Sequence, residues 1–346
     1  MATLFSRHSL VLQTSFSEIK RSAREQPVVA IGSPGSVGVR EVKGREFYYR
    51  QFYDARGRKT ASYVGPVGDP DAEARAGALR QGIEAAKAIA REVRILAAQG
   101  YVRVDGRTAA ILGALANRGI FRGGAILVGS HAYGALLNDI GIRAAAFFTE
   151  EVDIARGAVL AIAADSRFED ILAESTVPLR AVPGLGRADP STSYKAVGSD
   201  RLRVDLLVPG PASGVTTRAV PELKAHAEGL PYLGYLLEDS IEGVVLGRDS
   251  ALAVRVPRPE RFAWHKMFVA QERSTTSEKR TKDILQAAVL FAALVEDAPD
   301  ALEEALGALP RGARSKAIAG AKAVIVRLDA TGQPRAAETL RQLVGS

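Results

Sequence analysis

Three acidic residues in strand-like segments have the types and spacing that phosphoryl transfer needs. Glu151 and Asp153 are two apart in the alternating run 151–154, and Asp205 lies inside the apolar run 203–208. Side chains two apart in a strand point to the same face, so the first two carboxylates stand side by side. If the two strands are neighbours, the three carboxylates can hold two metal ions. Mg²⁺ (or Mn²⁺) is the expected metal, because it takes oxygen ligands and shares them with substrate phosphates.

A glycine–serine pair precedes the acidic residues. The apolar segment 125–128 runs into Gly129 and Ser130, and helix-like sequence follows. Glycine lets the backbone approach a phosphate closely, and the N–H groups at a helix N-terminus attract anions. We therefore expect Gly129 and Ser130 to bind the phosphates of a nucleotide. The alternative is a chance pair beside a solvated acidic strand, but an aspartate inside an apolar strand is costly to bury without a partner.

Basic residues gather in a helical region near the C-terminus: Lys266, Arg273, Lys279, Arg280 and Lys282. Lys266 is the first choice for a binding residue, because it lies on an otherwise amphipathic helix. Lys282 is the second choice, and Asp283 next to it can orient a lysine or cap a helix. The cluster 279–282 is equally consistent with a solvated helix start, and Trp264 is expected in the core.

Composition limits the classes of protein that this chain can join. The 346 residues contain no Cys, which excludes disulfides and thiolate metal sites, and the four His are scattered. No apolar run reaches the ~18 residues that a membrane span needs, and the first residues do not read as a signal peptide. We therefore expect a cytoplasmic protein without a membrane partner. The net charge of +7 favours an anionic partner, nucleotide or nucleic acid.

The elements around these residues predict an α/β (α+β) protein with three regions. Residues 1–100 form a β-hairpin and a long helix, 101–257 form the catalytic mixed sheet with flanking helices, and 258–346 form a helical domain. The chain passes from the second region to the third at 256–259, where two prolines suggest a hinge. The long segment after Ser130 leaves room for an extra turn or strand around 139–148.

The N-terminal region shows local signals for each element. Ser15 and Glu18 have capping-box spacing ahead of a short helix. Segments 46–53 and 59–64 read as a hairpin, in which aromatic residues alternating with arginine can stack on bases. A half-buried antiparallel pair is the favoured interpretation of that hairpin. The long helix starts at Asp69, followed by proline, and ends near Gly100.

The rest of the chain alternates between the two types of element. Helices are expected at 107–117 and 168–173, strands at 243–246 and 252–256, and a loop at 209–214. Five helices follow the hinge, at 262–269, 282–295, 301–309, 315–328 and 334–344.

Two further motifs are set aside. The glycine-rich stretch 32–38 follows an apolar run but lacks dinucleotide-binding spacing and is read as a loop. Ser130 and His131 are adjacent, so their side chains diverge at a helix start and do not form a nucleophile and its base.

The pattern Val128-Gly129-Ser130, Glu151-Val152-Asp153 and Asp205 resembles the signature of the DNA polymerase beta-type nucleotidyltransferase superfamily. More narrowly, the chain resembles a bacterial family of uncharacterised nucleotidyltransferase-like proteins over about 45–295. The features that carry this likeness are 63–66, 203–209, 264–267, Glu272-Arg273 and Lys282-Asp283.

The resemblance implies Mg²⁺-dependent transfer of a nucleoside monophosphate from a nucleoside triphosphate to an acceptor hydroxyl, with release of pyrophosphate. RNA, a protein or a small molecule is the acceptor. Glu151 and Asp153 would bind both metals, and Asp205 would bind the catalytic metal and help to deprotonate the acceptor. Gly129, Ser130, Lys266 and Lys282 would hold the triphosphate.

Two other functions stay open at this point. One is a non-catalytic protein that binds nucleic acid or another partner on a nucleotidyltransferase scaffold. The other is a toxin-like enzyme that modifies transfer RNA or a protein. The sequence indicates no oligomeric state.

Overall fold

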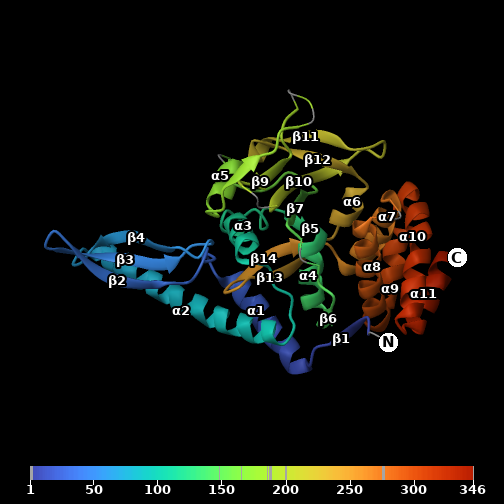
Figure 1. Ribbon diagram of the computed structural model, residues 1–346, viewed down its shortest axis with the longest axis horizontal. Coiled ribbons are helices and arrows are strands. Elements are labelled where there is room, and N and C mark those ends of the chain that lie inside the picture. Colours follow the sequence, from blue (N-terminus) through green and yellow to red (C-terminus); the bar gives the residue numbers. More distant parts are fainter. Residues whose placement is uncertain are drawn as a thin grey trace.

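A mixed sheet of seven strands lies at the centre of the computed structural model (Figure 1). The structure describes residues 3–147, 149–164, 166–184, 186, 189–198, 201–274 and 277–345. The main strand order is β11-β12-β10-β7-β5, and β9 pairs with both β10 and β8. The strands are β5 (Ala125–Val128), β7 (Glu151–Arg156), β8 (Leu179–Ala181), β9 (Ser193–Ala196), β10 (Arg203–Gly210), β11 (Thr216–Val220) and β12 (Ala225–Pro231). The predicted α/β (α+β) class with a mixed sheet is confirmed.

The two acidic strands are neighbours in this sheet. Strands β7 and β10 run parallel, with Asp153 opposite Asp205. Strand β5 runs antiparallel to β7 and places Val128 opposite Asp153. Val152 and Val204 are fully buried on the other face, which fixes the register because a slip of one residue would bury the acids and expose the valines. The hydrophobic core therefore sets where the carboxylates point.

Helices α3 (Gly106–Asn117) and α4 (Gly129–Asp139) flank β5 in the chain. Asp105 caps α3 by accepting hydrogen bonds from the backbone N–H groups of Arg107 and Thr108. Helix α4 follows β5 without a loop. In the hairpin of β13 (Ile241–Leu246) and β14 (Ala251–Val256), α3 contacts β14 and α4 contacts both strands. The predicted strand–turn–helix order is confirmed.

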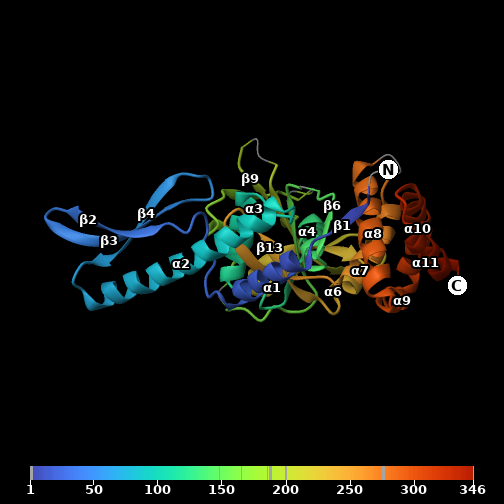
Figure 2. The same cartoon turned by 90° about the horizontal axis from the view of Figure 1, so that it is seen from below.

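The N-terminal region forms an arm that projects from the body in both views (Figures 1 and 2). It consists of β2 (Ser36–Val42), β3 (Arg45–Tyr53), β4 (Lys59–Pro66) and the long helix α2 (Pro70–Ala98). The Asp69 side chain accepts a hydrogen bond from Ala72 N, and Gly100 follows the helix with a φ of +93°, so the predicted start and end of α2 hold. The predicted hairpin forms β3 and β4, and β2 pairs with β3 as a third strand. The expected loop 32–38 ends early, because β2 begins at Ser36.

The predicted short helix with a capping box at Ser15 is wrong. Helix α1 spans Leu10–Glu25, and Ser15 Oγ donates a hydrogen bond to the carbonyl oxygen of Val11 within it. Leu10 and Val11 in the first turn are exposed, but Leu12 packs with Phe16, Ile19 and Ala23, so the apolar stripe begins before Ser15. The capping-box spacing at Ser15 and Glu18 therefore lies inside the helix.

The other predicted elements are found close to their expected positions. Helix α5 is Phe168–Ala173, and the expected loop 209–214 is shortened because β10 continues to Gly210. The extra turn or strand expected around 139–148 is strand β6 (Ile142–Ala144), which pairs with β1 (Phe5–Arg7). Phe148, near the end of that range, lies outside the described residues. The remaining short elements are η1 (Pro221–Leu223) and α6 (Leu233–Leu237).

Five helices follow β14 and pack together at one end of the molecule (Figure 1). They are α7 (Pro259–Glu272), α8 (Glu278–Asp297), α9 (Pro299–Gly307), α10 (Arg311–Ala330) and α11 (Pro334–Gly345). Trp264 is fully buried and its indole N–H donates a hydrogen bond to the Leu302 carbonyl oxygen, as expected of a core residue. In the part of the chain that the structure describes, no helix is long and apolar enough to cross a membrane.

Candidate active site

The turn between β5 and α4 is shaped around one carboxylate. Gly129 has a φ of +68°, which favours glycine, and a Cβ added there would lie 2.1 Å from Asp153 Oδ2. The Asp153 carboxylate therefore rests directly against the backbone of the turn. Only a residue without a side chain permits that approach.

The acidic side chains form rows across the sheet face. In one row Ser193, Asp205 and Asp153 are register partners on β9, β10 and β7. In the next row Arg203 stands opposite Glu151. The structure thus places the three predicted carboxylates on two neighbouring strands and adds two polar residues, Ser193 and Arg203, beside them.

Asp205 is held by the residues that surround it on the sheet. Its Oδ1 accepts short hydrogen bonds from Ser193 Oγ and Arg203 Nε. Arg203 Nη2 also donates to Ser193 Oγ at 3.0 Å. Asp205 is itself buried, so this network both neutralises and orients the carboxylate.

Burial and, to a smaller extent, the negative charges of Asp205 and Glu151 raise the pKa of Asp153 to about 7. Lys266 and Lys282 oppose the shift. Burial and the two neighbouring carboxylates thus both disfavour the ionised form of Asp153. A bound cation would relieve that repulsion.

Helix α8 supplies the opposite charge. Lys282 Nζ donates a hydrogen bond to Ser130 Oγ at 3.0 Å, and Lys279 Nζ donates to Glu151 Oε1 at 2.9 Å. Burial favours the neutral form of Glu151, but the hydrogen bond and charge of Lys279 outweigh it and lower the pKa of Glu151. Burial and the nearby Lys266 lower the pKa of Lys282. The start of α8 therefore lies against both the turn and the first acidic strand.

Lys266 and Arg273 form a second basic group around Asp283. Asp283 is fully buried; its Oδ1 accepts a hydrogen bond from Lys266 Nζ at 2.7 Å, and its Oδ2 lies 2.7 Å from Arg273 Nε. The Arg273 contact is an ion pair without hydrogen-bond alignment. Lys266 Nζ also lies 5.2 Å from the centre of the Phe262 ring. Asp283 thus fixes Lys266 in place, and Lys266 acts on Asp153 through its charge.

The donor set suits a hard divalent cation, because Asp153 and Asp205 offer carboxylate oxygens at one register position. Among the described residues, however, no group of three or more His, Asp or Glu is gathered closely enough to hold a metal ion. Glu151 is engaged by Lys279, and Asp205 by Arg203 and Ser193. Glu151 can join a metal site only if its ion pair with Lys279 opens.

Sequence reasoning missed Ser193 and Arg203 as partners of the site. Arg203 had a detectable signal, because it lies two residues before Asp205 and thus on the same strand face. Ser193 had none, because the segment that forms β9 shows no clear strand pattern. Adjacent His131 does not serve Ser130: burial lowers the pKa of His131 to about 4, and its Nε2 has no hydrogen-bond partner among the described residues.

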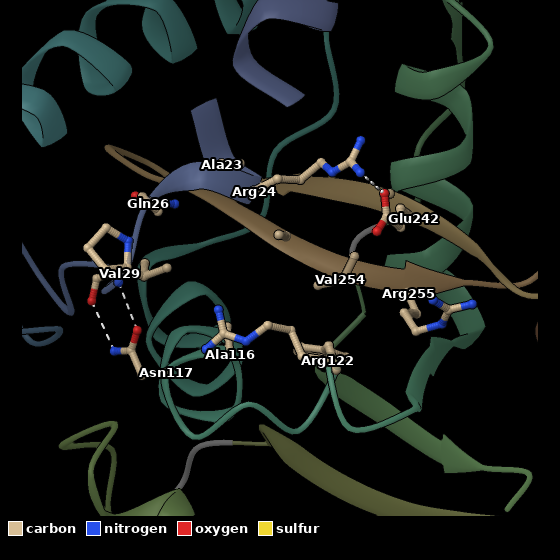
Figure 3. Close-up of a pocket in the computed structure, with 14 residues that line it drawn as sticks. Ala23, Arg24, Gln26, Val29, Ala116, Asn117, Arg122, Glu242, Val254 and Arg255 are labelled. Carbon is tan, nitrogen blue, oxygen red and sulfur yellow. Dashed lines mark hydrogen bonds and ion pairs between the residues drawn. The ribbon is translucent and has the colours of Figure 1, made fainter. Parts of the chain in front are cut away.

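A separate hollow of about 270 Å³ lies at the other end of β5, where the chain enters the strand (Figure 3). The Arg24–Glu242 ion pair and the hydrogen bonds between Asn117 and Val29 lie at its edges. Arg122 extends over it beside Ala116. None of the predicted site residues lines this hollow, so the acidic strands and the turn form their own site.

The mixed sheet, the glycine–serine turn and the acidic strands together define an α+β protein with a glycine–serine turn beside paired carboxylates. A family model described as a nucleotidyltransferase matches residues 106–309, more than half of the chain. The chain therefore belongs to this nucleotidyltransferase family. The matched part includes every predicted site residue and leaves out the N-terminal arm. No curated protein and no solved structure matches the chain.

Proposed function

We propose that the protein is a Mg²⁺-dependent nucleotidyltransferase of the DNA polymerase beta type. It moves a nucleoside monophosphate from a nucleoside triphosphate to an acceptor hydroxyl. The acceptor oxygen forms a bond to the α-phosphorus, the bond from that phosphorus to the bridging oxygen breaks, and pyrophosphate leaves. The observation that carries the proposal is the Asp153 carboxylate against Gly129, in register with Asp205.

The carboxylates would hold the metal and the acceptor. Asp153 and Asp205 would supply metal ligands from neighbouring strands, and Glu151 would join them after release from Lys279. Mg²⁺, when bound, would neutralise the triphosphate and favour loss of the hydroxyl proton. Asp205 would accept that proton, held toward the site by Arg203 and Ser193.

The turn and the two lysines would hold the triphosphate. The N-terminus of α4 presents backbone N–H groups next to Ser130, and Lys282 already reaches the Ser130 hydroxyl at 3.0 Å. Phosphate oxygens entering there would take hydrogen bonds from both side chains. Lys266 would add a positive charge from α7, held by Asp283. Together these groups offset the charge that develops on pyrophosphate as it leaves.

The direct test is incorporation of labelled nucleotide with and without Mg²⁺, in the wild type and in Asp153→Ala and Asp205→Ala. We expect each substitution to reduce transfer by about 100-fold or more, because it removes charge at the reacting centre. Glu169→Ala, an exposed acid on α5, is the matched control and should keep activity. Undiminished transfer in both aspartate variants would refute the assignment.

One observation favours a second candidate, a non-catalytic nucleic-acid-binding protein on the same scaffold. Cationic side chains already occupy two of the carboxylates, Lys279 on Glu151 and Arg203 on Asp205. This function requires salt-sensitive binding of RNA or DNA that persists in Asp153→Ala. It also requires that Mg²⁺ does not affect triphosphate binding, which equilibrium dialysis with labelled triphosphate measures.

A further inference from the structure

The arm exposes one face of its three-stranded sheet. Tyr48 and Val64 pack on Ala72 and Ala76 of α2, so that face is covered. The other face carries aromatic and basic side chains, here called the open face: Arg40, Phe47, Tyr49, Tyr53, Lys59 and Tyr63. These residues follow from the strand register, since side chains opposite one another across a strand pair share a face.

The rings on the open face form a contiguous group. Tyr63 lies 5.8 Å from Phe47 and 5.7 Å from Tyr49 between ring centres. The Arg40 guanidinium lies 5.4 Å from the centre of the Tyr49 ring. Tyr63 is 58% exposed and Tyr53 54% exposed, which is unusual for large rings in a sheet. Several ring surfaces and a guanidinium are thus available to a partner at one place.

The arm also carries much of the positive charge of the chain. Residues 36–66 contain seven Lys or Arg and three Asp or Glu, a net of +4, whereas the whole chain has +7. The arm stands apart from the body in Figures 1 and 2. Helix α2 packs on the sheet at Ala76 and on the body from Val93 onward, 17 residues or about 25 Å along the helix. The arm lies outside the matched family range 106–309.

We propose that the open face binds single-stranded RNA and so selects the acceptor for transfer. Bases stack on exposed tyrosine rings, and arginine and lysine contact the phosphates. Two copies of this face would bring like charges together, which disfavours self-association. A duplex hides its base faces from such a surface. The tyrosine hydroxyls and the amide of Gln51 on the same face offer hydrogen bonds to ribose 2′-hydroxyls.

The role as acceptor rests on the proposed function, because RNA supplies the hydroxyl to which the nucleotide is transferred. The distance of about 25 Å along α2 sets a length scale for such an acceptor. At about 3.4 Å per nucleotide, the rise of a stacked strand, roughly seven nucleotides pass from the open face to the body. Much shorter oligonucleotides should therefore be poor acceptors.

The test is fluorescence anisotropy with a labelled 20-nucleotide single-stranded RNA of mixed sequence, in the absence of Mg²⁺ and triphosphate. We expect Tyr49→Ala/Tyr63→Ala to weaken binding by about 10- to 100-fold, since each stacked base contributes about tenfold. Tyr63→Phe keeps the ring and should bind nearly as the wild type. Arg91→Ala, on an exposed side of α2, is the control for general charge loss. Tyr63→Ala alone repeats the test at the most exposed ring.

The proposal would be overturned by wild-type protein that does not bind the RNA, by a double variant that binds it as well as the wild type does, or by equal binding of DNA with the same sequence. Gel filtration that shows a wild-type dimer dissociated by the double substitution would also overturn it, in favour of an interface between two copies. RNA binding without any nucleotide transfer would reject the proposed function and leave the open face standing. Transfer to RNA that is unchanged in the double variant would reject the open face alone.

Discussion

At Gly129 the Asp153 carboxylate occupies the space that a side chain would need. A Cβ there would lie 2.1 Å from Asp153 Oδ2, and φ is +68°. The glycine is therefore required twice, by conformation and by contact. The interaction explains why an apolar strand that ends in Gly-Ser and an acid-x-acid strand belong to one site.

Comparing Gly129→Ala with Gly119→Ala should separate the cost of the positive φ from the cost of the contact with Asp153. Gly119 has a similar φ of +73° but nothing within 4 Å of an added Cβ. We expect Gly119→Ala to cost about 1 kcal/mol from backbone strain alone, and Gly129→Ala to cost about 3 kcal/mol or more. Urea denaturation measures both. Equal losses would show that Asp153 does not press on the turn.

The raised pKa of Asp153 gives a stability signature that runs opposite to that of a salt-bridged acid. Its pKa rises from 3.8 to about 7 on folding. Between about pH 4 and pH 7 the folded protein holds one proton more than the unfolded chain, so stability falls as the pH rises. Asp153→Asn should remove this penalty and so raise the free energy of unfolding by at most about 4 kcal/mol at pH 8. Below about pH 4 the variant and the wild type should be equally stable. Thermal unfolding of both proteins from pH 4 to 8 checks this; a difference independent of pH would contradict it.

Asp283 compensates the charges of the buried Lys266 and the partly buried Arg273. Removing it in Asp283→Ala leaves Lys266 and the partly buried Arg273 without their counter-ion, for an expected loss of about 3–5 kcal/mol. The control is Asp329→Ala, which breaks an ion pair with Arg341 at the surface and should cost less than about 1 kcal/mol. Chemical denaturation compares the two. Similar losses would mean that Asp283 does not stabilise the lysine in the way described.

At the scale of elements, the start of α8 sets the electrostatics of the site. Lys279 and Lys282 are three apart on this helix, and they reach the acidic strand and the glycine–serine turn respectively. One helix thus controls both the metal-binding and the phosphate-binding side of the proposed site.

Substitutions of these two lysines should therefore have opposite effects. Lys279→Ala releases Glu151 and should tighten Mg²⁺ binding several-fold, whereas Lys282→Ala should weaken triphosphate binding by about 10-fold. Isothermal titration calorimetry measures both affinities. If Lys279→Ala weakens Mg²⁺ binding, Glu151 is not a ligand that Lys279 holds back.

The sequence was most informative where the signals are local. Alternation around Asp153 and Asp205 predicted their strands, and Pro334 marked a helix start. Residues 256–259 were read as a hinge before a helix at 262–269, whereas α7 already begins at Pro259. It failed where pairing is decided by distant residues. Strand β9 carries Ser193, whose role depends on its place beside Asp205, and a sequence pattern cannot show that contact. The start of α1 was missed because Ser9, at its N-cap, makes no side-chain cap hydrogen bond, whereas the capping-box spacing at Ser15 lies inside the helix.

At the scale of the whole molecule, the family match and the site coincide in the body, and the arm is an addition to them. The sequence left open whether the acidic strands are neighbours, because β7 and β10 are separated along the chain by α5, β8 and β9. The division into body, arm and helical end therefore suggests separate tasks: chemistry on the sheet, charge from α7 and α8, and acceptor binding on the arm.

The central claim is tested most directly by the fate of the label on a nucleoside triphosphate. The protein is incubated with Mg²⁺, a 20-nucleotide RNA and triphosphate that is labelled on either the α- or the γ-phosphorus. We expect label to enter the RNA from the α-position only, with pyrophosphate released, and to stay absent in Asp153→Ala. Transfer from the γ-position, or α-label transfer that survives Asp153→Ala, would contradict nucleotidyl transfer at this site.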